Sequence, residues 1–165
     1  MLVDWETAIE DLVGSVYTAI NLRKTLTEFV NNAFTLERTA IPHKDLEDLV
    51  NNHGDGIVYV VPGTPGDVGN IGRKPSGGLR EFSVQVGFQV APVEPQDWTA
   101  VVQHLQFIAQ LEAAAMFDPD GFEWLRLEYL KDENDVPFTF MGLRNANIFE
   151  AYFTAFYQRG VRPPN

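Results

Sequence analysis

The sequence predicts an α+β fold with a mainly antiparallel or mixed β-sheet packed by two long helices, in one domain spanning residues 1–159 with an exposed tail at 160–165. At 165 residues the chain has the length of one domain that can bury a core. Apolar residues recur at helical spacing in only two long stretches. Several shorter stretches read as strands, and they do not alternate regularly with helices as in a parallel sheet.

The first long helix is expected to begin after Asp4, whose side chain can cap its N-terminus. Its apolar residues are spaced by three and four, and they are Trp5, Ile9, Leu12, Val13, Val16 and Ile20. The same spacing continues to Val30, so we expect the helix to end near Asn31.

The next segment predicts two strands separated by a short helix. Residues 34–41 read as a strand, and Pro42 ends it because proline lacks a backbone donor. Residues 43–51 carry apolar side chains at helical spacing, so a short helical turn is expected there. The wholly apolar residues 57–61 are expected to form a buried strand.

Residues 62–78 are expected to form a mobile loop, because they contain six glycines and three prolines with hardly any apolar side chains. The glycines match neither the dinucleotide-binding fingerprint nor the phosphate loop of nucleotide hydrolases, so no cofactor is predicted. Arg73, Lys74 and Arg80 make this region locally positive. We interpret these three residues as docking the loop on an acidic partner surface, with simply solvated charges as the alternative.

The second half of the chain contains the clearest strand and the second long helix. Residues 79–90 alternate apolar and polar side chains, which predicts a strand with one buried face. Asp97 can cap a helix over residues 98–116, whose apolar side chains recur at helical spacing. Residues 122–131 are expected to form a further strand, followed by a connection that ends near Asn147.

The last predicted strand, residues 148–157, is apolar on both faces of the pleat. Antiparallel sheets normally pack one face on the core and leave the other to solvent, so the second face needs cover from a helix or another subunit. Glu150, Tyr152 and Phe156 share the less apolar face. We therefore predict that these three residues contact a neighbouring copy of the chain.

The net charge is −11, from 23 acidic and 12 basic residues. This balance argues against a module that grips nucleic acid, which uses lysine and arginine on the phosphates. An acidic surface can still face DNA that must pass without adhering, although acidity for solubility is the simpler interpretation. The chain has no cysteine, no secretory signal pattern and no membrane-length apolar stretch, so we expect a protein that stays in the cytoplasm.

No motif predicts catalysis or metal binding. The histidines His43, His53 and His104 belong to no tight metal-binding pattern. The segment from Asp118 resembles the start of a calcium loop, but Tyr129 stands where that loop requires its closing glutamate. No nucleophile elbow is present, and spacing alone identifies no serine, histidine and aspartate grouping. We therefore predict a protein that is not an enzyme.

Several stretches resemble the tail-terminator, or tail-completion, proteins of long-tailed bacteriophages: residues 58–62, the strand at 79–90, Asp97 with its helix, and the closing strand at 146–159. The resemblance implies a virion protein, assembled in the host cytoplasm, that forms a hexameric ring at the head-proximal end of the tail tube. It implies that the ring stops tube growth and contacts both the tail-tube protein and the head-tail connector. Genomic DNA would pass through its channel without specific binding, which the acidic charge fits.

Other interpretations stay open. One is a small intracellular ligand-binding or hydrolytic α+β domain, with a pocket beneath the loop at residues 62–78. Among structural proteins, a head-tail adaptor or a tail-tube subunit would do related work. The predicted strands are few for the β-sandwich or barrel of a tube protein, and the two-helix pattern departs from mostly helical adaptors.

Overall fold

A computed structural model describes residues 5–39, 46–54, 56–63, 79–90, 97–116, 121–129 and 149–160. Its helices and strands, in chain order, are α1 (Trp5–Thr25), β1 (Thr35–Glu37), α2 (Leu46–Asn52), β2 (Ile57–Pro62), β3 (Leu79–Val90), α4 (Trp98–Met116), β4 (Glu123–Tyr129) and β5 (Phe149–Gly160). The strands form a five-stranded sheet in the order β1-β2-β3-β5-β4.

The sheet is mixed, and the chain has the predicted α+β fold. Strand β1 runs parallel to β2, whereas the other neighbouring pairs are antiparallel. The longest pairing joins β3 to β5 over twelve residues each, from Leu79 opposite Gly160 to Val90 opposite Phe149. The prediction of two long helices holds for α1 and α4 but is incomplete, because the short helix α2 packs on the sheet as well.

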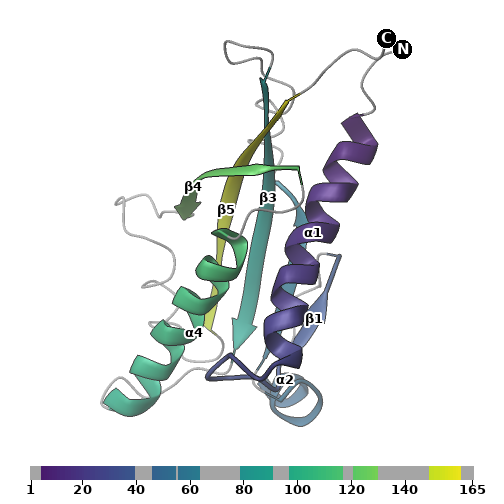
Figure 1. Cartoon of the computed structure of the whole chain (residues 1–165). Coiled ribbons are helices and arrows are strands. Elements are labelled where there is room, and N and C mark those ends of the chain that lie inside the picture. The colour runs from purple at the N-terminus through teal and green to yellow at the C-terminus, as the bar shows by residue number, and fades with distance from the viewer. Residues whose placement is uncertain are drawn as a thin grey trace, which may run out of the picture.

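Both long helices cover one face of the sheet (Figure 1). Alternate residues of β3 point toward them, so Phe82, Val84, Val86, Phe88 and Val90 are all buried. These side chains form one core with α1, α4 and β5, whose contributions include Leu12, Ile20, Phe107, Leu111, Phe153 and Tyr157. Helix α2 lies on the opposite face, where Leu49 and Ile57 form a separate small cluster.

Helix α1 ends at Thr25, well before the predicted end near Asn31. Thr27 takes a left-handed backbone conformation with a φ of 55°. Its N–H donates to the carbonyl of Lys24 at 3.0 Å, and the N–H of Glu28 donates to the carbonyl of Arg23 at 2.9 Å. This is the hydrogen-bond pattern of a Schellman motif, which terminates a helix.

The early end of α1 lets Phe29 enter the core from the following turn. The Phe29 ring packs edge-on against Phe34 and Phe107, at centroid distances of 5.3 and 5.8 Å. Val30, in contrast, is 43% exposed. The apolar spacing of these residues therefore reflects burial of Phe29 outside the helix rather than continuation of the helix.

The predicted strand at residues 34–41 shortens to Thr35–Glu37. Strand β1 is at the sheet edge and pairs only with the first three residues of β2, Ile57 to Tyr59. The strand at 122–131 is likewise found as Glu123–Tyr129, and the last strand extends beyond residue 157 to Gly160. Residues 64–78, most of the predicted mobile loop, and the connection before the last strand lie outside the described residues.

Candidate functional site

The face of the sheet opposite α1 and α4 is built largely of polar side chains, and we call it the polar face. Away from β1 and from Ile57 beneath α2, it comprises Tyr59 and Val61 from β2, Glu81, Ser83, Gln85 and Gln89 from β3, Glu123, Arg126 and Glu128 from β4, and Thr154, Phe156 and Gln158 from β5. Ser83, Gln89 and Thr154 are buried although they are polar. A sheet face of this composition does not resemble an ordinary hydrophobic core.

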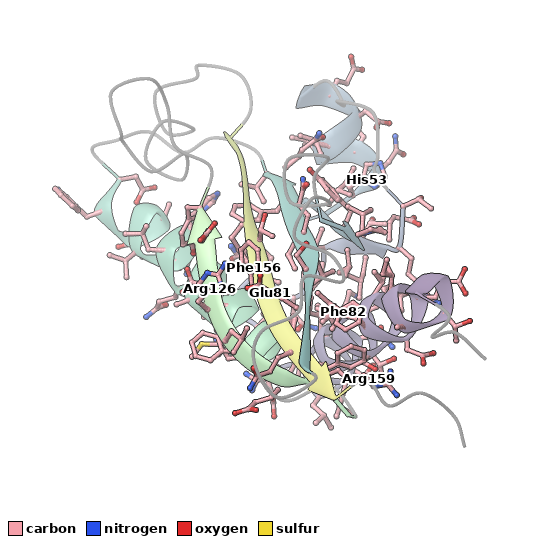
Figure 2. All side chains as sticks on the ribbon, turned by 90° about the horizontal axis from the view of Figure 1, so that it is seen from above. His53, Glu81, Phe82, Arg126, Phe156 and Arg159 are labelled. Atoms are coloured by element: carbon pink, nitrogen blue, oxygen red, sulfur yellow. The ribbon has the colours of Figure 1, made fainter. Side chains whose placement is uncertain are left out.

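At the β4 side of the polar face, Arg126 joins two carboxylates over an aromatic ring. Its Nη1 donates to Glu81 Oε1 at 2.6 Å, and its Nε donates to Glu128 Oε1 at 3.1 Å. The guanidinium carbon is 4.0 Å from the centroid of the Phe156 ring, a cation–π geometry. Figure 2 shows Arg126, Glu81 and Phe156 grouped on this part of the sheet.

A β-bulge directs Arg126 to this face. The pairing of β4 with β5 shifts register between Trp124 and Arg126, so Trp124 lies opposite Tyr157 while Arg126 lies opposite Phe156. An inserted residue of this kind redirects the side chains that follow it. Trp124 accordingly packs against the core, and Arg126 points to the polar face.

The charges of this group act on one another. Burial lowers the pKa of the Arg126 guanidinium, but hydrogen bonds and charge attraction from Glu81 and Glu128 outweigh burial and raise that pKa above its usual value. Next to them, Gln158 Nε2 donates to Glu123 Oε2 at 2.6 Å. The described polar face thus carries three glutamates against one arginine, and it is locally acidic like the whole chain.

The centre of the polar face depends on a glycine. Tyr59 lies opposite Gly87 in the β2–β3 register, and a Cβ added at Gly87 would overlap the Tyr59 ring. Gln85 Nε2 donates to the Tyr59 hydroxyl at 3.4 Å. The aromatic ring therefore occupies the space that a side chain at position 87 would need.

A second polar group lies apart from the first, at the junction of β1 and α2. His53 Nδ1 is 3.0 Å from Thr35 Oγ1, and His53 Nε2 is 3.2 Å from Asp48 Oδ2. When Nε2 carries the ring proton and donates a hydrogen bond to Asp48, Nδ1 can accept a hydrogen bond from the threonine hydroxyl. This is the hydroxyl, imidazole and carboxylate order of a nucleophile relay, formed by residues that spacing alone did not bring together.

The same three residues also stabilise the chain locally. Asn52 Nδ2 donates to Asp48 Oδ1 at 2.8 Å, and the N–H of Thr35 donates to the carbonyl of Gly56 at 2.8 Å. The first bond lies within α2, and the second attaches the short edge strand β1 to the turn after α2. Figure 2 shows His53 well separated from the Arg126 group, so the two polar groups are distinct sites.

Five of the predicted functional residues have no described side chain. Arg73 and Lys74 lie outside the described residues, and only the backbones of Arg80, Glu150 and Tyr152 are described. Their roles in partner docking and subunit contact therefore stay predictions.

Phe156 lies on the polar face, as the strand alternation predicts, but it is only 1% exposed within the single chain. Arg126 lies over its ring, so a neighbouring copy approaching this position would first meet Arg126 and its glutamates. A subunit contact at Phe156 stays a prediction.

The three histidines and the Asp118 segment, which match no complete metal-binding motif, are only partly described. His104 Nδ1 lies 3.2 Å from the carbonyl of Ala100 in its own helix, whereas His43 and Asp118 are outside the described residues. Within the described ranges, histidine, aspartate and glutamate form no group of three or more that could hold a metal ion. None of the described helices is long and apolar enough to cross a membrane.

Comparison of the chain with protein-family models and with curated protein sequences finds no match.

Proposed function

We propose that this protein is a structural component of the neck of a long-tailed bacteriophage. It forms a ring, hexameric by the sequence resemblance, at the head-proximal end of the tail tube. The ring stops tube growth, joins the tail to the head connector and leaves a channel for DNA. In this role the protein acts through shape and charge, without catalysis.

The observation that carries the proposal is the division of the sheet into two unlike faces. The face of the sheet that packs against α1 and α4, which we call the helix face, holds the fold together. The polar face carries three described glutamates against one arginine on long strands. An acidic face repeated around a ring suits passing DNA, because like charge keeps the phosphates from adhering. Glu150 and Tyr152 follow on the same strand face, where we propose contact with the next copy.

The experiment is to add the purified chain to polymerising tail-tube protein and to image the tubes by negative-stain electron microscopy. A neck ring predicts shorter tubes that end in a single cap of defined symmetry. The test variant is Arg126→Glu, which replaces the one described cation of the polar face, and its matched control is Thr18→Glu on the exposed side of α1. The first should disturb capping more than the second. Tubes of unchanged length without caps would contradict the proposal.

The second candidate is a hydrolytic α+β domain, and the Thr35, His53 and Asp48 arrangement is the observation that favours it. A small activated ester is the direct probe, because a relayed threonine hydroxyl would attack its carbonyl. Hydrolysis that is lost in both Thr35→Val and His53→Gln, with the fold retained, would support this candidate. Equal rates in the wild type and both variants would remove it.

A further inference from the structure

Helix α4 has a second apolar side, facing away from the core. Its buried side consists of Phe107, Ile108, Leu111, Ala114 and Ala115. On the outer side, Trp98 is 74% exposed, Val102 45%, Leu105 40% and Met116 44%. Ala109 is also exposed, and the half-buried Glu112 completes the row. We call Trp98, Val102, Leu105, Ala109, Glu112 and Met116 the outer stripe.

The spacing of the outer stripe fits a helical partner. Its members follow one another at intervals of four, three, four, three and four residues, which is the heptad spacing of paired helices. With a rise of 1.5 Å per residue, the stripe is about 27 Å long. A partner that contacts its whole length must run alongside α4, as another helix does.

The outer stripe also carries little charge. Helix α4 contains no lysine or arginine, and Glu112 is its single carboxylate, in a chain with a net charge of −11. The buried centres of protein interfaces are depleted of charge in the same way. A second copy can therefore approach at α4 more closely than at the charged surfaces elsewhere.

We propose that the outer stripe of α4 packs antiparallel against the outer stripe of α4 from a second copy of this chain. Antiparallel pairing about the stripe centre places Trp98 against Met116 of the second copy, a favourable ring–thioether contact. It places the larger Leu105 against the small Ala109 of the second copy. The contact is two-fold, so each stripe supplies both halves of the interface.

The position of Glu112 selects the antiparallel direction. Parallel pairing in register would bring the two Glu112 carboxylates together on an apolar interface. Antiparallel pairing places them about ten residues apart along the axes, or roughly 15 Å, beyond the screening length of about 8 Å at physiological salt. Each Glu112 then faces Val102 of the second copy.

This dimer is independent of the proposed ring. Helix α4 lies on the opposite side of the sheet from the polar face, so pairing at the stripe does not use the polar face. A contact one helix wide is smaller than the standard interface of about 800 Å² per partner. We therefore expect a reversible dimer that forms as the protein concentration rises.

Sedimentation analysis of the full chain over a wide concentration series tests the pairing. The wild type is expected to pass from monomer to dimer, and Leu105→Glu should weaken association about tenfold or more by placing two carboxylates in the stripe. Leu26→Glu is the matched control, because Leu26 is 57% exposed at the end of α1 and should leave dimerisation unchanged. A wild type that is monomeric throughout, or a dimer indifferent to Leu105→Glu, would overturn the proposal.

Disulfide trapping tests the direction and remains informative if Leu105→Glu misfolds. The chain has no cysteine, so Val102→Cys and Glu112→Cys each introduce one thiol. Antiparallel pairing predicts a disulfide in the mixture of the two variants and little in either variant alone, because like positions are too far apart to bridge. Strong cross-linking of each variant with itself, or none in the mixture, would contradict the antiparallel pair.

Discussion

The two faces of the sheet are built from the same strands but do different work. On β3, Phe88 points into the core and is 1% exposed, while Gln85 on the other side is partly buried and donates a hydrogen bond to the Tyr59 hydroxyl. The helix face gains stability from apolar burial, which depends little on direction. The polar face depends instead on directed hydrogen bonds and charges. The two faces therefore differ in the kind of interaction that stabilises them.

The largest expected effect is on the helix face. Phe88→Ala should lower the free energy of unfolding by about 3–5 kcal/mol, because it leaves a cavity next to Phe107. Gln85→Ala, three residues away on the polar face, should cost less than about 1 kcal/mol. Denaturant unfolding measures the loss of stability in both variants, and equal losses would contradict the difference between the two faces.

The next effect concerns the closest contact on the polar face. Gly87→Ala should destabilise the chain by about 1–3 kcal/mol, because the new methyl group overlaps the Tyr59 ring. Adding Tyr59→Ala should recover part of this loss, so the double variant should be more stable than additivity predicts. Purely additive losses in thermal unfolding would show that the ring does not occupy that space.

A smaller loss of stability is expected at Arg126, whose contacts are ion pairs and a cation–π contact rather than apolar packing. Arg126→Met removes both ion pairs and the cation over Phe156, but Arg126 is 45% exposed and solvent weakens each interaction. We expect a loss of about 1 kcal/mol that shrinks at high salt. Arg126→Lys keeps the charge but loses the two-pronged geometry, so it should recover only part of the stability. A loss independent of salt would mean that packing of the side chain dominates.

The smallest expected change in stability comes from Glu112 on α4. Burial raises the pKa of Glu112, so the folded chain binds that proton more tightly than the unfolded chain. The resulting stabilisation is complete below the unfolded pKa and is lost as pH rises through the folded pKa. Glu112→Gln should therefore be slightly more stable than the wild type near neutral pH. Chemical unfolding at low and neutral pH measures this, and a variant that is less stable at neutral pH would refute the sign.

Regular patterns allowed much of the fold to be predicted from the sequence. The alternation in β3 and the apolar spacing of α4 fixed both elements at Leu79–Val90 and Trp98–Met116. The predicted end of α1 was wrong, because Phe29 keeps the helical spacing although it packs into the core from the turn after the helix. Spacing records which side chains are buried, and it does not record the left-handed conformation of Thr27 that ends the helix.

The candidate sites were much harder to predict. Arg126 and Glu81 are 45 positions apart, and only the pairing of β3, β5 and β4 brings them together. The bulge after Trp124 also reverses the alternation that would assign Arg126 to a face. His53 and Thr35 meet across 18 positions for the same reason, that contacts between elements follow topology rather than spacing. The sequence also did not separate the outer stripe from the buried side of α4, because the apolar residues of both recur at helical spacing.

We propose that this chain occupies the neck of a phage particle. The most direct measurement is electron microscopy of particles labelled with a gold-tagged antibody against the chain. The proposal predicts one site of label, at the head-proximal end of the tail. Label along the whole tail would indicate a tube subunit, and particles without label would contradict the neck assignment.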